Sequence, residues 1–125
     1  MNDITIILFS KNPNKLDLYR TVFGCLKQKN INTKIIIYTI ENDSTIEYIN
    51  NINNPNIEII TNTSSEYSTE YILLDKILRS VKTKYISFFS SNNIIVDTKS
   101  INEINKIKNE DSVCCFSNFL YYNSG

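Results

Sequence analysis

Apolar residues in this chain follow two alternating patterns, short continuous runs and stripes with helical spacing. The continuous runs, rich in isoleucine, lie at 4–9, 34–40, 57–60 and 84–89. Such runs predict strands that are buried on both faces. The first helical stripe consists of Leu16, Tyr19, Phe23 and Leu26. Strands that alternate with amphipathic helices indicate an α/β fold, with a mostly parallel sheet, helices on both faces and three layers.

Polar residues mark the expected starts of the helices. Asn12 before Pro13 suits an N-cap followed by proline at the first helical position. Two capping boxes follow the same logic, and they are formed by Ser44 with Glu47 and by Ser100 with Glu103. A further helix is expected from about Ser68 to Val81, and a fifth strand at 113–116.

The candidate binding loops follow from the parallel sheet, because ligands of such sheets bind at the carboxyl ends of the strands. These loops are residues 10–14, 41–44, 61–66 and 90–93. Dinucleotide and P-loop sites need several glycines, and the chain has only Gly24 and Gly125, so both are excluded. Glu41 and Asn42 could hydrogen-bond a ribose or a base, but helix capping explains Ser44 equally well.

Composition narrows the function classes further. The 13 basic and 13 acidic residues balance, so the chain lacks the basic field typical of nucleic-acid binding. With no histidine, a Ser-His-Asp or Cys-His site is excluded. The three cysteines match no metal motif. No apolar run approaches the roughly 20 residues of a membrane span, and no signal-peptide pattern is visible, so we expect a cytoplasmic protein.

Four stretches carry a resemblance to a known family. They are the opening strand and loop at 4–12, the helix end Cys25-Leu26-Lys27-Gln28, the strand and loop at 35–45, and the stretch at 84–93. In this order they resemble the N-terminal half of family 2 glycosyltransferases, which have the Rossmann-like GT-A fold. Glu41-Asn42-Asp43-Ser44-Thr45 stands where that family usually has Asp-Asp-Gly-Ser-Thr, and Ser90-Ser91-Asn92-Asn93 stands at its Asp-x-Asp-Asp.

The resemblance implies that residues 1–125 form one domain that binds a nucleotide sugar, as a piece of a longer catalytic domain. By this resemblance the nucleotide site would consist of Ser10, Asn12, Glu41, Asn42, Ser90 and Asn92. In the family, the Asp-x-Asp carboxylates hold a divalent cation that neutralises the departing diphosphate. Hydroxyls and amides are poor ligands for Mg²⁺ or Mn²⁺, so we expect neither metal here, and no sugar transfer by this chain alone.

Two other functions fit the same pattern. The fold could be a non-catalytic scaffold that uses its strand-end surface to bind a protein partner, and an exposed apolar patch near Tyr121-Tyr122 would favour this. A receiver-like module needs acidic residues at the strand ends, whereas the first strand ends in Ser10-Lys11.

Overall fold

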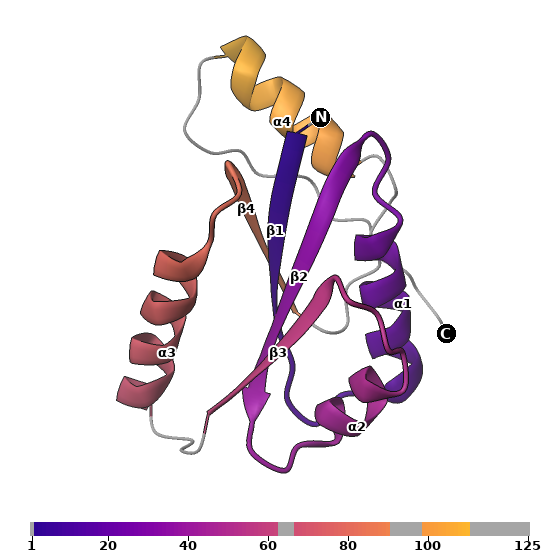
Figure 1. Ribbon diagram of the computed structural model, residues 1–125, viewed down its shortest axis with the longest axis vertical. Coiled ribbons are helices and arrows are strands. Elements are labelled where there is room, and N and C mark those ends of the chain that lie inside the picture. Colours follow the sequence, from indigo (N-terminus) through magenta and orange to yellow (C-terminus); the bar gives the residue numbers. More distant parts are fainter. Residues whose placement is uncertain (1, 63–66, 91–98, 111–125) are drawn as a thin grey trace, which may run out of the picture.

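One parallel sheet forms the centre of the structure, with helices on both of its faces (Figure 1). The computed structural model describes residues 2–62, 67–90 and 99–110. In chain order its elements are β1 (Asn2–Phe9), α1 (Lys15–Leu26), β2 (Ile31–Ile40), α2 (Ser44–Asn50), β3 (Ile57–Asn62), α3 (Tyr67–Ser80), β4 (Tyr85–Ser90) and α4 (Lys99–Glu110). The strand order is β3-β2-β1-β4, and all three pairs are parallel. This confirms the predicted α/β class with three layers.

The sheet buries apolar side chains on both faces, as the continuous isoleucine runs predicted. Ile6 and Leu8 of β1 are fully buried in the larger core, together with residues of α1, α2 and α4. Ile7 and Ile36 point to the opposite face, where they pack with Ile77 of α3. Alternate residues of β1 therefore contribute to two cores, which explains why its apolar run shows no alternation with polar residues.

All four strands include residues beyond the apolar runs that predicted them. The ladder between β1 and β2 begins with Asn2 opposite Ile31, so β2 starts three residues before the predicted Lys34. The ladder between β2 and β3 continues to Asn62, opposite Ile40. Backbone pairing thus includes polar residues that hydropathy alone assigned to loops. The fifth strand predicted at 113–116 lies outside the described residues.

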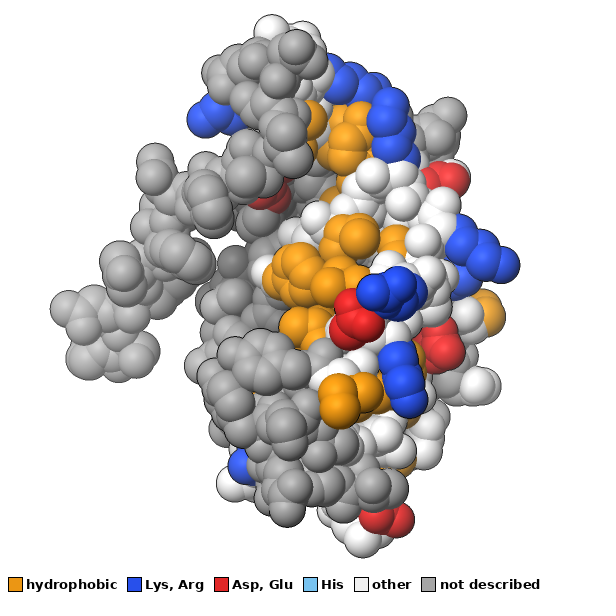
Figure 2. Space-filling view, turned by 90° about the vertical axis from the view of Figure 1, so that its left-hand side faces the viewer, with side chains coloured by type: hydrophobic (Ala, Val, Ile, Leu, Met, Phe, Trp, Pro, Cys, Tyr) orange, Lys and Arg blue, Asp and Glu red, His pale blue; other side chains and the backbone are white. Residues whose placement is uncertain are grey.

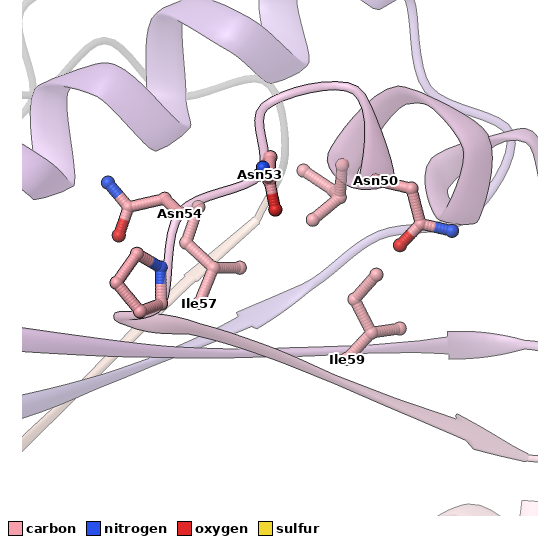
Figure 3. A pocket seen from close by; sticks show the side chains of 7 residues that line it. Asn50, Asn53, Asn54, Ile57 and Ile59 are labelled. Atoms are coloured by element: carbon pink, nitrogen blue, oxygen red, sulfur yellow. The ribbon is translucent and has the colours of Figure 1, made fainter.

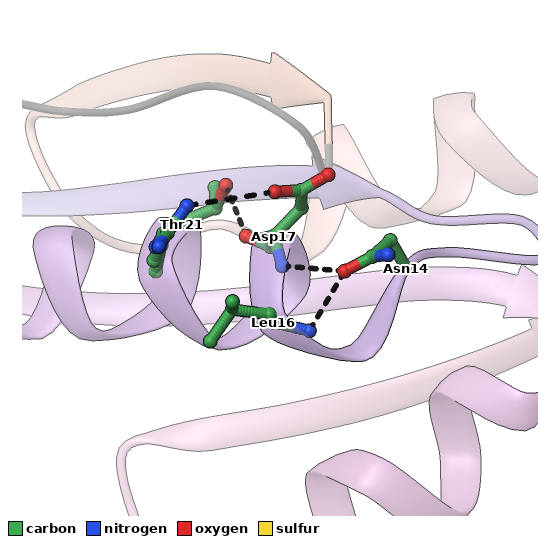
Figure 4. Close-up of polar contacts among 5 residues, drawn as sticks. Asn14, Leu16, Asp17 and Thr21 are labelled. Carbon is green, nitrogen blue, oxygen red and sulfur yellow. Dashed lines mark hydrogen bonds and ion pairs between the residues drawn. The ribbon is translucent and has the colours of Figure 1, made fainter. Parts of the chain in front are cut away.

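Helix α1 begins two residues later than its sequence suggested. Its N-cap is Asn14, whose side-chain oxygen accepts from the backbone N–H groups of Leu16, at 3.0 Å, and Asp17, at 3.2 Å (Figure 4). The prediction of Asn12 as the N-cap is therefore wrong. Asn12 instead has a φ of 47°, in the left-handed region, which places it in the turn before the helix.

The other two predicted caps also differ from the structure. Asp43, and not Ser44, caps α2, because its carboxylate accepts from the backbone N–H of Thr45. Ser100 lies inside the first turn of α4, which begins at Lys99. At α2 the neighbours Asp43 and Ser44 are both good N-caps, and the contact of Asp43 with Asn12 favours Asp43.

The apolar stripe that predicted α1 is not its most buried face. Leu16 and Phe23 are 56% and 41% exposed. The face against the sheet is one of small and medium side chains, and its buried members are Leu18, Thr21, Val22 and Cys25. Both stripes have helical spacing, so periodicity predicted the helix without fixing its rotation about its axis.

Gln28 connects the end of α1 to the start of α4. Its side-chain N–H donates to the carbonyl of Gly24 at 2.9 Å, and its side-chain oxygen accepts from the backbone N–H of Ser100 at 2.8 Å. Gln28 is buried. One amide side chain thus satisfies backbone groups of two helix termini, and its contact with Ser100 spans 72 residues of sequence.

Candidate functional site

The carboxyl ends of β1 and β2 lie side by side, and two of the predicted loops leave the sheet there. Ser10 follows β1, and its backbone N–H still donates to Tyr38 of β2 at 3.1 Å. Glu41 follows β2, and its backbone N–H donates to Asn62 of β3 at 2.8 Å. Loops 10–14 and 41–44 therefore start from neighbouring positions on one edge of the sheet, as strand-end loops of a parallel sheet should.

Asp43 joins these two loops directly. Its Oδ1 accepts from the backbone N–H of Asn12 at 2.8 Å, across 31 residues of sequence. Its Oδ2 accepts from the backbone N–H of Thr45 at 3.0 Å and from the Thr45 hydroxyl at 2.6 Å. Both carboxylate oxygens thus accept hydrogen bonds from the protein, and Asp43 holds the two loops together.

The Ser10 hydroxyl extends the same arrangement into the interior. It lies 2.7 Å from the Thr45 hydroxyl, and both residues are fully buried. Thr45 uses its single hydroxyl hydrogen toward Asp43, so Ser10 must donate to the Thr45 oxygen. We call the four residues Ser10, Asn12, Asp43 and Thr45 the Asp43 network. Within this network Ser10 is buried, so its hydroxyl stabilises the loops through Thr45 and does not face solvent.

The protonation of Asp43 follows from these contacts. Partial burial on its own raises the pKa of a carboxyl group, because the charged form loses hydration. The hydrogen bonds from the Thr45 side chain and backbone and from the Asn12 backbone favour the charged form, and they outweigh the burial. The pKa of Asp43 is therefore lowered, and Asp43 is ionised at neutral pH.

Glu41, Asn42 and Asn12 are among the groups that remain exposed at this edge. Asn12 and Asn42 both adopt positive φ, at 47° and 63°, which asparagine tolerates better than most residues. A carboxylate and two amides can accept hydrogen bonds from hydroxyls, and the amides can also donate to a base. These are the three sequence-predicted site residues that the structure brings together at the surface.

The fourth strand reaches the same edge. Ser90 ends β4 and pairs in register with Phe9, next to the start of loop 10–14. Asn92 and the rest of the stretch 91–93 lie outside the described residues. Within the described ranges, no group of three or more His, Cys, Asp or Glu residues could hold a metal ion.

A hollow of about 440 Å³ lies elsewhere, between α2 and the first half of β3 (Figure 3). Its lining is uncharged and consists of Ile49, Asn50, Asn53, Asn54, Pro55, Ile57 and Ile59. Asn54 already accepts from the backbone N–H of Asn56, at 2.8 Å. Since the hollow offers no charged side chain and lies away from the carboxyl ends, it is a weaker candidate for a nucleotide than the strand-end edge.

The surface beside α3 shows no concentrated charge. In Figure 2, which shows this side, basic and acidic side chains are scattered among apolar ones over the described residues. No helix in the described ranges has both the length and the apolar content to cross a membrane.

Comparison with known proteins adds no relative. No protein-family model matches this sequence, and a search of curated proteins gives no match.

Proposed function

We propose that this chain is a cytoplasmic, non-catalytic domain of glycosyltransferase-like type that binds a nucleotide or a nucleotide sugar, without a metal ion, at the carboxyl ends of β1 and β2. The observation that carries the proposal is the contact between Asp43 and the backbone of Asn12, at 2.8 Å. This contact holds two strand-end loops together and leaves Glu41 and Asn42 exposed beside them.

The chemistry of this edge suits the nucleoside part of such a ligand. The exposed Glu41 carboxylate can accept hydrogen bonds from ribose hydroxyls, and the Asn42 amide can both donate to a base and accept from it. Without the family's metal-binding carboxylates, no divalent cation would neutralise the departing diphosphate, so we expect weak binding and no transfer of the sugar. Family resemblance suggests uridine as the first nucleoside to test.

Titration calorimetry with uridine, adenosine and guanosine diphosphate sugars tests the proposal. We expect heat of binding for at least one nucleotide, with the same affinity in the presence and absence of Mn²⁺. Absence of heat for every nucleotide under both conditions would refute it. An affinity that rises steeply with Mn²⁺ would refute its metal-independent form.

Two matched asparagine variants locate the site. Asn42→Gly removes the side chain and keeps the backbone relaxed, because glycine readily adopts a φ of 63°. Asn53→Gly makes the same change at a residue with a φ of 51° that lines the hollow beside β3. Losing one hydrogen bond should weaken binding roughly two- to tenfold in Asn42→Gly. Asn53→Gly should bind like the unchanged protein, and the reverse pattern would place the ligand in the hollow.

A second function, docking of a protein partner, is favoured by one observation on β4. Ile86 and Phe88 are 40% and 55% exposed. Their register with Thr5 and Ile7 puts them on the face that α3 covers elsewhere in the sheet. Parallel sheets are usually covered on both faces, so this uncovered part of β4 suits a protein contact. The patch predicted near Tyr121-Tyr122 lies outside the described residues.

Light scattering coupled to gel filtration separates the two functions. If Ile86 and Phe88 form an interface between copies of the chain, the protein should elute above its monomer mass of 14.5 kDa. Phe88→Ser should then restore the monomer. A monomeric protein that binds a nucleotide and is unaffected by Phe88→Ser favours the first function over the second.

A further inference from the structure

From the contacts of its carboxylate we infer that Asp43 is a positioning residue, which fixes loop 10–14 against loop 41–45 and so sets the shape of the strand-end site. Its role in ligand binding rests on the proposed function, but its role in holding the loops does not. The motif that this chain resembles has glycine at the position of Asp43. The carboxylate is therefore a property of this chain and cannot be carried over from the family.

The first support is that the two oxygens of Asp43 serve different loops. Oδ2 accepts from the backbone and hydroxyl of Thr45, within its own loop and the first turn of α2. Oδ1 is left for Asn12, whose backbone N–H reaches it at 2.8 Å from the other loop. An N-cap needs only one acceptor, so capping α2 does not account for the second contact.

The second support is the backbone of the residues on either side of the contact. Asn12 has a φ of 47° and Asn42 a φ of 63°, values that most residues with a β-carbon adopt only at a cost. Both residues are exposed, so packing of their own side chains does not hold them there. The hydrogen bond between Asp43 and Asn12 ties the two turns together and restricts them to one arrangement.

The third support lies beneath the loops. The buried Ser10 hydroxyl donates to Thr45, which in turn donates to Asp43, so the Asp43 network is anchored in the protein core. Hydrogen bonds to a charged group in series strengthen one another. The backbone and the hydroxyl of Thr45 thus hold the Asp43 carboxylate in place. The carboxylate in turn positions the exposed loop 10–14 through Asn12.

The Asp43→Ser variant separates loop positioning from helix capping. Serine caps helices about as well as aspartate, so it keeps an acceptor for the Thr45 N–H. Its single, shorter side chain cannot also reach Asn12. The Asp43→Asn variant is the matched comparison, because it keeps the shape and one acceptor oxygen while removing the charge.

Amide hydrogen exchange measured by nuclear magnetic resonance reports the contact without any ligand. We expect the Asn12 N–H of the unchanged protein to be protected, and to exchange at least about tenfold faster in Asp43→Ser, as loss of a hydrogen bond to a charged group implies. The Thr45 N–H should keep its protection in Asp43→Ser. In Asp43→Asn, the exchange rate of the Asn12 N–H should lie between the rates in the unchanged protein and in Asp43→Ser. Equal exchange of Asn12 in all three proteins would overturn the inference.

Nucleotide affinity, measured by calorimetry on the same three proteins, tests the consequence for binding. We expect the unchanged protein to bind the nucleotide most tightly, Asp43→Asn to bind it less tightly, and Asp43→Ser to bind it most weakly. If the unchanged protein binds a nucleotide and Asp43→Ser binds it equally well, the positioning role is wrong. If no protein binds while Asn12 shows the expected exchange, the proposed function fails and the loop contact stands.

Discussion

Helix α1 offers a direct test of the fold, because two leucines two residues apart lie in opposite environments. Leu18 is fully buried against the sheet, whereas Leu16 is 56% exposed. Leu16→Ala and Leu18→Ala are the same chemical change in the same helix, so differences in helix propensity largely cancel. The comparison isolates burial.

The expected magnitudes differ several-fold. Replacing a buried leucine by alanine costs about 2–5 kcal/mol, from lost burial and from the cavity that remains. A surface substitution of this kind costs roughly 0.5 kcal/mol or less. For a chain of 125 residues, an unfolding entropy of about 2.1 cal/mol/K per residue makes 1 kcal/mol equal to roughly 4 °C in Tm. Leu18→Ala should thus lower Tm by about 8–20 °C, and Leu16→Ala by only about 2 °C.

Thermal and urea unfolding followed by circular dichroism measure both variants. The helical signal of the folded state should be the same in the two proteins, so that only the midpoints differ. Equal losses, or a larger loss for Leu16→Ala, would show that α1 faces the sheet through the stripe that contains Leu16 and Phe23. The rotation of α1 described above would then be wrong.

Two further predictions concern polar contacts. Gln28→Ala removes both hydrogen bonds that join α1 to α4, and it should lower the free energy of unfolding by roughly 1–3 kcal/mol in a urea titration; an unchanged midpoint would contradict this role. Because the pKa of Asp43 is lowered in the folded state, its stabilisation is complete above the ordinary carboxyl pKa and is lost as pH falls through the lowered value. The stability gap between the unchanged protein and Asp43→Ser should therefore stay constant above the ordinary carboxyl pKa of 3.8 and narrow as the pH falls below it, and a gap independent of pH would contradict the contact.

The sheet was the most predictable part of the structure. Short apolar runs predicted all four described strands. The runs did not predict the strand order, because the ladder that places β4 beside β1 joins Ile4 to Tyr85 across most of the chain. The extra residues of β2 and β3 also depend on backbone pairing, which leaves no hydropathy signal.

The helix starts were less predictable, for a physical reason. Asp43 and Ser44 are both good N-caps, and sequence alone cannot choose between them. The choice is made by the contact of Asp43 with Asn12, which comes from a loop 31 residues away. The spacing of Asp43 and Thr45, an acidic residue two positions before a hydroxyl at a helix start, was the available signal.

The sequence predicted where the candidate loops meet, but it did not predict what each of their residues contacts. Loops 10–14 and 41–44 do meet at one edge, as expected for neighbouring parallel strands. Ser10 was predicted to contact a ligand, yet it lies buried under the loop and bonded to Thr45. Burial depends on the packing of α2 over β1, and a serine that follows a strand gives no sign of it.

Nuclear magnetic resonance titration with a uridine diphosphate sugar tests the central claim, nucleotide binding at the strand-end edge, most directly. We expect the largest amide shifts at Asn12, Glu41 and Asn42. These shifts should saturate, and they should be the same with and without Mn²⁺. Absence of shifts up to millimolar ligand would contradict it. So would shifts centred on Asn53 and Ile57, at the hollow beside β3.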